Sequence, residues 1–335
     1  MGKLLRMYWQ PVAVAADVAP GKTLPVRIMN EDLTVYRGQS GSPYVVGSRC
    51  AHRRTVLHIG WVEGECLRCM FHGWKYDGSG QCVEAPAEGP SFPQGVKILS
   101  YPAEDYAGLI FAYMGEGVPP DLPRYSELGR ADGIQWARGD AGHPWPCNWF
   151  QRVETTFDSV HVHFTHEHGA YPPSGVRIEA EETDWGIRAD AYRATDFSSS
   201  EFIWPNCHHR LRSDSGTDVF TWFVPMDDEQ SLAFRANFIP VLGDADRPFE
   251  EALESSPQYF PAEHAEQVFA RQKVWNQEDE EFVTRVGQGP IADYTQERLG
   301  QSDVAIILRR KIFEREMEAI AQGRPTKRWK PRVSS

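Results

Sequence analysis

Two short motifs that each join a cysteine to a histidine constrain the fold of this chain most strongly. Cys50-Ala51-His52 is followed, after sixteen residues, by Cys69-Met70-Phe71-His72. Gly47 precedes the first motif and Gly73 follows the second, so two loops can bring these side chains to one centre. Two thiolates and two imidazoles suit zinc, or a [2Fe-2S] cluster in which the histidines bind one iron and the cysteines the other.

The other four cysteines fit this pattern less well. Cys66 makes a Cys-x-x-Cys motif with Cys69, but its use as a ligand would break the pairing of each cysteine with a following histidine. Six cysteines in 335 residues are also too few for a disulfide scaffold. We therefore interpret as ordinary small apolar side chains Cys66, Cys82, Cys147 and Cys207.

Composition and charge exclude several classes of protein. The chain is 41% apolar, which is enough to form a sizeable core, and its net charge is 35 − 47 = −12, which disfavours nucleic acid as a partner. No run approaches the roughly 18 apolar residues of a membrane-spanning helix. Arg6 lies where a signal peptide would need apolar residues, so we expect a cytoplasmic protein without a membrane partner.

Alternating runs separated by turn residues predict a β domain at the start of the chain. The expected strands lie at residues 24–29, 32–37, 44–48 and 108–114. The segment 115–123 is rich in glycine and proline, a composition that stiffens a chain without building a core. We place the domain boundary in it and predict domains at residues 1–117 and 118–335.

The second domain has a mixed pattern that predicts an α+β fold. Residues 149–164 and 261–286 are expected to be helical, and residues 188–240 are rich in expected strands. A last helix is expected to begin after Ser302 or Asp303, to end at Gly323 and to cover one face of a sheet.

A second group of candidate metal ligands lies in the first of these helical segments. Asp158 precedes His161 by three residues, and His166 follows it by five. Two imidazoles and a carboxylate leave open positions on Fe(II), as O2 activation requires, although zinc accepts the same ligands. His163 and His168 repeat the five-residue step without a carboxylate upstream, so we favour His161 and His166.

Both groups of ligands resemble those of a known family. Cys50-Ala51-His52-Arg53 with Cys69-Met70-Phe71-His72-Gly73-Trp74 resembles the Rieske motif of Rieske non-heme iron oxygenases. The resemblance implies an all-β Rieske [2Fe-2S] domain followed by a helix-plus-antiparallel-sheet, helix-grip-like catalytic domain. It also implies that the edges of His52 and His72 can pass electrons outward.

The stretch from Asn148-Trp149 through Glu154 to Asp158-x2-His161-x4-His166 resembles the mononuclear iron motif of the same family. There, the residue matching Asp158 is not a ligand but bridges the Rieske cluster of one subunit and the iron-binding histidine of its neighbour. The resemblance therefore implies a homotrimer. We expect Asn148, Gln151 and Glu154 to support the iron site.

The third iron ligand is expected near Gly289-Pro290-Ile291, a motif that resembles the phthalate-dioxygenase and aryl O-demethylase branch. In that branch the ligand is an aspartate eight residues before the glycine, and this chain has Glu281 there. Asp279 has the usual residue type but lies about 200° away on a helix, so the two are exclusive alternatives. We favour Glu281, and we expect Glu278 and Glu280 to lie on a solvated face.

These resemblances imply an oxygenase that hydroxylates or O-demethylates a carboxylated or phenolic aromatic compound with O2. The alternatives are cis-dihydroxylation and, outside enzymes, a Rieske electron-transfer protein. NADH is the implied electron source. Because the chain has no Gly-x-Gly-x-x-Gly motif, we expect a separate flavin reductase and, in some arrangements, a ferredoxin.

Aromatic and polar residues around position 205 could line a pocket for an aromatic substrate, although core packing explains them equally well. They are Phe202, Trp204, Asn206, His208 and Trp222.

Overall fold

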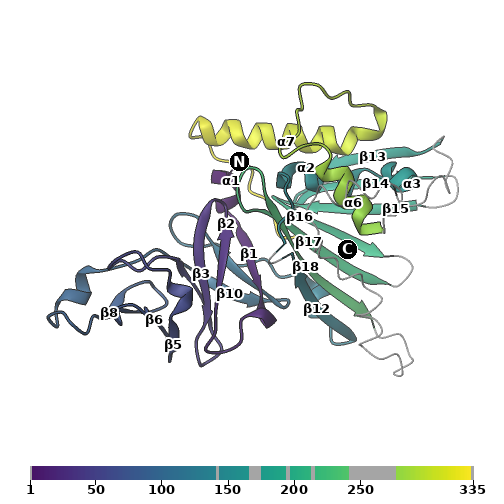
Figure 1. Ribbon diagram of the computed structural model, residues 1–335. Helices are drawn as coiled ribbons and strands as arrows, with labels where there is room; N and C mark the ends of the chain where they lie inside the picture. Colours follow the sequence, from purple (N-terminus) through teal and green to yellow (C-terminus); the bar gives the residue numbers. More distant parts are fainter. Residues whose placement is uncertain are drawn as a thin grey trace. The chain divides into compact units, whose positions relative to one another are not determined.

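The computed structural model describes residues 2–140, 143–165, 175–193, 197–212, 216–240 and 277–332. Contacts within the chain define two units, one made of Met1–Pro123 with Trp136–Gly139 and one made of Arg124–Gln135 with Asp140–Ser335. Figure 1 shows the helices and strands of both units. The predicted boundary between residues 117 and 118 stays a prediction.

Three small antiparallel sheets form the first unit, after a short helix, α1 (Gly2–Arg6). The first sheet has the order β1 (Trp9–Val14), β11 (Leu109–Tyr113), β10 (Ala103–Tyr106). The second has the order β2 (Thr23–Ile28), β3 (Glu31–Arg37), β4 (Pro43–Gly47), β9 (Ser100–Tyr101). The third has the order β5 (Trp61–Glu63), β6 (Cys66–Arg68), β7 (Lys75–Tyr76), β8 (Cys82–Glu84). The expected all-β character of this part is confirmed.

A seven-stranded sheet forms the centre of the second unit, as the strand-rich pattern predicts. Its order is β12 (Gly133–Gly139), β18 (Ser231–Pro240), β17 (Thr217–Pro225), β16 (Cys207–Arg212), β15 (Phe197–Ile203), β14 (Gly186–Tyr192), β13 (Arg177–Glu182). The strands from β13 to β18 form antiparallel pairs.

The strand register assigns side chains to the two faces of this sheet, because directly opposed residues share a face and successive residues alternate. One row joins Phe202, His208, Thr221 and Arg235. The rings of Phe202 and His208 lie 5.7 and 6.0 Å from that of Phe157, which belongs to a helical segment. We call this side of the sheet the helix face, and the side that carries His209 the opposite face.

The helical segment expected at residues 149–164 is broken into three pieces. They are α2 (Trp149–Glu154), a 3-10 turn (Thr155–Phe157) and α3 (His161–Thr165). The break occurs at Asp158, whose backbone is extended and whose Oδ1 accepts hydrogen bonds from the backbone N–H groups of Val160 at 2.9 Å and His161 at 3.1 Å. A carboxylate that caps the next helix competes with helix continuation. The expectation that Asp158 and His161 share one continuous helix was therefore wrong.

Two further helices complete the described part of the second unit. α6 (Gln277–Val286) packs on α3, and residues 261–276 of the predicted helix lie outside the described residues. α7 (Val304–Ala321) packs on β13 and β14, as expected of a helix that covers a sheet (Figure 1). Gly323 ends it with a positive φ of 64°, a conformation that glycine adopts without steric cost. Within the described residues, no helix is both long and apolar enough to cross a membrane.

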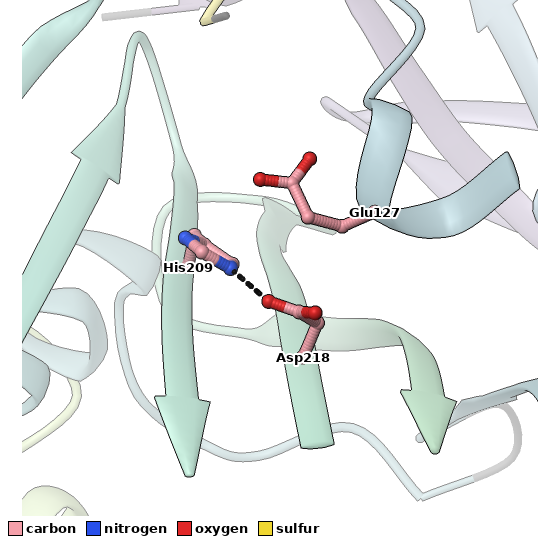
Figure 2. Close-up of side chains that lie close together, drawn as sticks. All are labelled: Glu127, His209 and Asp218. Atoms are coloured by element: carbon pink, nitrogen blue, oxygen red, sulfur yellow. Dashed lines mark hydrogen bonds and ion pairs between the residues drawn. The ribbon is translucent and has the colours of Figure 1, made fainter. Parts of the chain in front are cut away.

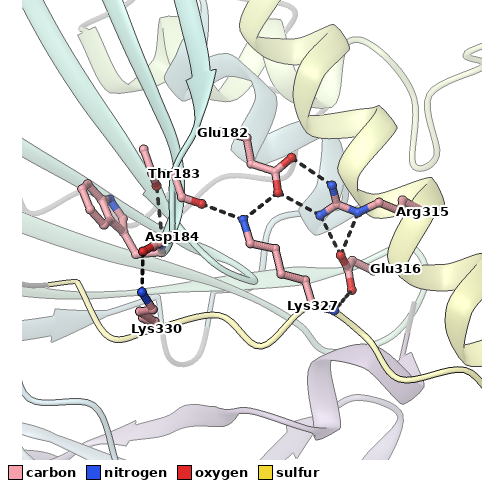
Figure 3. A network of polar contacts seen from close by, with 8 residues as sticks. Glu182, Thr183, Asp184, Arg315, Glu316, Lys327 and Lys330 are labelled. Atoms are coloured by element: carbon pink, nitrogen blue, oxygen red, sulfur yellow. Dashed lines mark hydrogen bonds and ion pairs between the residues drawn. The ribbon is translucent and has the colours of Figure 1, made fainter.

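The segment after α7 is attached to the β13–β14 hairpin by charged groups (Figure 3). Lys327 Nζ donates to Glu182 Oε1 at 2.7 Å, and Lys330 Nζ donates to Asp184 Oδ2 at 2.7 Å. The backbone N–H of Lys327 donates to Glu316 Oε2 at 2.8 Å, and the Glu316 side chain is 1% exposed. These contacts hold the segment after α7 against α7 and the β13–β14 hairpin.

A buried ion cluster joins α2 to α7. The Arg309 side chain is fully buried, lies 3.8 Å from the ring centroid of Phe150 and is 3.4 Å from Glu154 Oε1. Glu154 also accepts hydrogen bonds from Arg310 at 2.6 and 2.7 Å, and Arg310 reaches Glu297 at 2.5 Å. Glu154 is therefore the counter-charge for a guanidinium that water does not reach.

We expect removal of this counter-charge to cost more than removal of the guanidinium. Glu154→Gln leaves Arg309 as a buried charge without compensation, and the free energy of unfolding should fall by about 3 kcal/mol. Arg309→Met keeps a similar volume and leaves Glu154 paired with Arg310, so the loss should be about 1 kcal/mol. Urea unfolding followed by circular dichroism measures both; equal losses would contradict this account.

Candidate functional site

The two Cys–His motifs of the first unit lie in two similar turns. The Cys50 N–H donates to the Thr55 carbonyl at 2.9 Å, and the Arg54 N–H donates to the Cys50 carbonyl at 3.0 Å. In the second turn the Cys69 N–H donates to the Trp74 carbonyl at 2.8 Å, and the Gly73 N–H donates to the Cys69 carbonyl at 3.1 Å. Gly73 has a φ of +74°, which a side chain would strain.

These turns bring the four predicted ligands together. Cys50 and Cys69 are each 2% exposed, and the nearby Cys50 contributes to the raised pKa of the Cys69 thiol. The imidazole centroids of His52 and His72 lie 4.5 Å apart, and His52 stacks on Trp74 at 4.6 Å. The Cys50 sulfur lies 3.1 Å from the Tyr76 hydroxyl. The donor set is therefore assembled from segments that are separated in the sequence.

The chemistry of this donor set fits an iron-sulfur cluster. His52 Nδ1 is buried, and among the described residues it has no hydrogen-bond partner, so its lone pair is available to a metal. Burial and the nearby His52 lower the pKa of His72, which favours the neutral form that binds metals. Burial raises the pKa of the Cys69 thiol, whereas the backbone N–H groups of Phe71 and His72 lower it. Such N–H groups stabilise a ligating sulfur.

Figure 1 labels α3 and α6, which carry the second group of candidate ligands. His161 begins α3, and its Nε2 lies 3.4 Å from Glu281 Oε1 of α6, although the two residues are 120 positions apart. Its Nδ1 lies 3.8 Å from Asp158 Oδ2. A carboxylate at one ring nitrogen orients the other nitrogen toward a metal. The two groups are thus placed as a histidine and a carboxylate ligand would be.

The acidic residues of α6 lie in different surroundings. Glu281 Oε2 forms an ion pair with Arg285, one turn later on the helix. Glu280 is 6% exposed, so the expectation that it lies on a solvated face was wrong. The backbone of Asp279 belongs to α6, but its side chain lies outside the described part, as do the His163 side chain and the whole of His166 and His168.

The residues expected to support the iron site have different partners: Glu154 pairs with Arg309 and Arg310, whereas Gln151 and Asn148 bind backbone groups. Gln151 Nε2 donates to the carbonyls of Arg285 at 3.1 Å and Gly289 at 2.8 Å, and its Oε1 accepts from the Ala292 N–H at 2.8 Å. Gln151 thus joins α2 to the end of α6. Asn148 caps α2 by accepting from the Phe150 N–H at 2.9 Å.

Two of the five candidate pocket residues, Phe202 and His208, lie in the same row on the helix face. His208 is 9% exposed, and its Nε2 is buried without a hydrogen-bond partner in the described part of the chain. Burial, with the nearby positive charges of Arg210 and other groups, lowers the pKa of His208 to about 3. His208 is therefore a neutral imidazole with one polar atom that a ligand could satisfy.

The other three candidates are placed differently. Trp222 lies on the opposite face, where its ring centroid is 6.3 Å from that of Tyr125. Trp204 packs between Phe313 at 4.3 Å and Trp329 at 4.8 Å. Asn206 Nδ2 donates to the Phe223 carbonyl at 2.8 Å, which ties the β15–β16 turn to β17. The structure thus does not bring all five residues together.

A further group of titratable residues lies on the opposite face (Figure 2). His209 Nε2 lies 2.9 Å from Asp218 Oδ1, and its Nδ1 lies 3.0 Å from Glu201 Oε2. Arg332 forms ion pairs with both Glu201 and Glu127. Glu127, His209 and Asp218 could in principle hold a metal ion, but both imidazole nitrogens already face carboxylates and a guanidinium lies beside them. We interpret this group as a buried ion-pair cluster.

This cluster is not apparent in the sequence because its members, from Glu127 to Arg332, are separated by up to 205 positions. One signal was available. His208 and His209 are consecutive in a stretch expected to be strand, so one imidazole must face each side of the sheet. Arg285 was also missed, although its position four residues after Glu281 places the two side chains on one helix face.

The chain is similar to known proteins that contain a Rieske domain or are named as oxygenase subunits. A match to the Rieske [2Fe-2S] domain covers residues 8–102. The chain is 35% identical to the 5,5'-dehydrodivanillate O-demethylase oxygenase subunit of Sphingobium sp., over 98% of this chain and 79% of the relative. It is 29% identical to the phenoxybenzoate dioxygenase subunit alpha of Ectopseudomonas oleovorans, over 96% and 83%.

A solved structure has the same fold. It is the reduced complex between oxygenase and ferredoxin in carbazole 1,9a-dioxygenase, which matches with a TM-score of 0.68 and 19% identity, over 91% of this chain and 88% of that chain.

The ion cluster around His209 predicts a pH dependence of stability. Burial opposes protonation of His209, but the hydrogen bonds with Asp218 and Glu201 outweigh it and raise its pKa above the ordinary value of 6.5. The stabilisation is therefore fully present below pH 6.5 and is lost as the pH rises through the raised pKa. We expect the difference in unfolding free energy between wild type and His209→Gln to shrink as the pH rises above 6.5.

The matched control is His208→Gln. His208 stays neutral in the folded protein, because its pKa there is about 3, but its pKa in the unfolded chain is the ordinary 6.5. Wild type should therefore gain stability relative to His208→Gln as the pH rises toward 6.5 and keep a constant difference above it, which is opposite to the trend expected for His209→Gln. Urea titrations of the three proteins measure both effects. A constant difference between wild type and His209→Gln would contradict the assignment of a charged His209.

Proposed function

This chain belongs to the Rieske non-heme iron oxygenases as a terminal oxygenase subunit, and from that premise we propose that it O-demethylates or hydroxylates a carboxylated or phenolic aromatic compound. The main support for this proposal is the distance of 3.4 Å between His161 Nε2 and Glu281 Oε1, a histidine and a carboxylate placed as metal ligands. The other unit of the chain contains a separate set of two cysteines and two histidines. A protein that only transfers electrons through its Rieske cluster would not need a second metal site at His161 and Glu281.

We assign Cys50 and Cys69 to one iron of the [2Fe-2S] cluster and His52 and His72 to the other. The buried thiols and the buried Nδ1 atom of His52 support this assignment. When bound, the cluster supplies single electrons at a potential raised by its neutral ligands. Trp74 stacks on His52 and holds its ring in place, while the exposed ring of His72 offers an exit toward the surface.

We assign the mononuclear iron to His161, His166 and Glu281. The position of Glu281 beside His161 supports this assignment over Asp279, which lies two residues earlier on the same helix. A step of two residues is a rotation of about 200°, so the two positions are on different faces of α6. The protein's own contribution is orientation. Asp158 fixes the start of α3 with Oδ1 and faces His161 Nδ1 with Oδ2, so that Nε2 is directed toward Glu281.

We further propose that Asp158 connects the cluster of one subunit to the iron site of its neighbour in a homotrimer. The Asp158 side chain is 32% exposed, so a group from another subunit can reach it. For electron supply we propose a flavin reductase and, in some arrangements, a ferredoxin. Exposed Met70 and Phe71, with Arg53 5.4 Å from the Phe71 ring, offer a surface beside the cluster loops.

On the substrate side, we propose that His208 offers its Nε2 to a polar group of the aromatic compound, while Phe202 of the same row contributes apolar surface. Arg235 also belongs to this row, and its positive charge suits a carboxylate or phenolate. Trp222 lies on the opposite face, Asn206 binds the Phe223 carbonyl, and Trp204 packs between Phe313 and Trp329 with its ring 6.4 Å from that of Phe202. These contacts favour a structural role for the three residues.

The second candidate reaction is cis-dihydroxylation, which the similarity to a phenoxybenzoate dioxygenase subunit favours. Labelled O2 separates the reactions. With an NADH-driven reductase and a panel of methoxylated and carboxylated aromatics, O-demethylation should release formaldehyde and an equal amount of phenol whose oxygen carries no label. Hydroxylation would place one labelled atom on the product, and dihydroxylation would place two. Reduction of the cluster without any organic product would contradict an oxygenase.

The assignment of the third ligand predicts a contrast between two variants. Glu281→Gln removes the carboxylate beside His161, so we expect mononuclear iron and oxygenation to be lost while the Rieske electron paramagnetic resonance signal persists. Asp279→Asn should retain most of the iron and the activity. Metal analysis by mass spectrometry gives the iron count per chain. The reverse pattern would transfer the assignment to Asp279.

A further inference from the structure

Glu281 is a longer carboxylate than the aspartate usual in this branch, and its surroundings suggest why. Its two oxygens have different neighbours: Oε1 faces His161 Nε2 at 3.4 Å, whereas Oε2 is paired with Arg285. Arg285 follows by four residues on α6, so the two side chains lie one above the other on the same face of the helix.

Arg285 is fixed in this position by its own packing. Its side chain is 8% exposed, and its guanidinium carbon lies 5.6 Å from the ring centroid of Trp145. The same ring contacts Arg152 at 3.9 Å on one side and Phe282 at 5.2 Å on another. The Arg285 carbonyl accepts a hydrogen bond from Gln151, which anchors this turn of α6 to α2. The guanidinium is therefore a rigid cation rather than a mobile surface group.

The pairing of charges around Trp145 is specific. Arg152 is compensated by Asp140 at 2.5 Å, and Arg285 is compensated by Glu281. A buried guanidinium requires a counter-charge. Arg285 therefore retains Glu281 Oε2, and this geometry leaves one oxygen, Oε1, on the side of His161.

We propose that Arg285 is a positioning residue for the mononuclear iron site: it holds Oε2 of Glu281 so that the carboxylate presents only Oε1 to the metal. The inference rests on the proposed assignment of Glu281 as a ligand. It explains how glutamate serves at this position, since the extra methylene lets one carboxylate reach both Arg285 and the metal. An aspartate at residue 281 would be too short to satisfy both.

A double-mutant cycle on metal binding tests this role. The protein keeps its Rieske cluster, its mononuclear iron is removed with a chelator, and Co(II) is titrated back in competition with a chromophoric chelator. Arg285→Met releases the carboxylate, and we expect the Co(II) dissociation constant to rise at least tenfold. In the Glu281→Asp background the pairing is already lost, so Arg285→Met should change the constant less than twofold.

A structural role would act equally in both backgrounds, and an equal effect would overturn the proposal, as would unchanged affinity in Arg285→Met. The control is Arg315→Met, which makes the same substitution at an arginine of α7 that pairs with Glu182, and it should leave Co(II) affinity unaltered. Thermal unfolding and the Rieske signal verify that each variant is folded. If Glu281→Gln keeps the metal, the ligand assignment fails; if it loses the metal while Arg285→Met binds normally, only the positioning role fails.

Discussion

The second unit depends on a single electrostatic constraint: each guanidinium buried under the helix face needs a carboxylate within reach. Arg309 has Glu154, Arg152 has Asp140 and Arg285 has Glu281. Each pair costs desolvation, and a partner left alone costs far more. The Arg309–Glu154 pair therefore fixes α7 against α2, and the Arg152–Asp140 pair fixes α2 against the residue that follows β12. The Arg285–Glu281 pair lies within α6, where it sets the position of one side chain relative to the other.

The candidate iron site inherits its geometry from this arrangement. Gln151 on α2 binds the backbone at the end of α6, and Arg285 binds Glu281 one turn earlier. Glu281 thereby reaches α3, which Asp158 has separated from α2 by ending the preceding turn. Because the helical segment is broken at Asp158, His161 can face Glu281 of α6 although it lies only seven residues after the end of α2.

Much of this could be predicted from the sequence, because it depends on local signals. Alternation in residues 24–29 and 32–37 predicted β2 and β3, and the Cys–His spacing predicted two converging loops. The break at Asp158 could not be predicted from helical periodicity. In the sequence, an aspartate that caps a helix cannot be distinguished from an aspartate on the surface of a continuous helix. Nor could sequence place Trp222 on the face opposite His208, because that depends on the register between β16 and β17.

The path of the segment after α7 affects the order in which the chain can fold during synthesis. Arg332 joins Glu127 and Glu201, which lie 205 and 131 positions earlier, over the opposite face of the sheet. A ribosome adds residues from the N-terminus, so β13 to β18 are all synthesised long before the arginine that neutralises their acidic cluster. Until then Glu127, Glu201 and Asp218 lack the positive charge of Arg332, and their mutual repulsion opposes closure of that face. The three small sheets draw all of their strands from residues 9–113, so they can form while the second unit is still emerging.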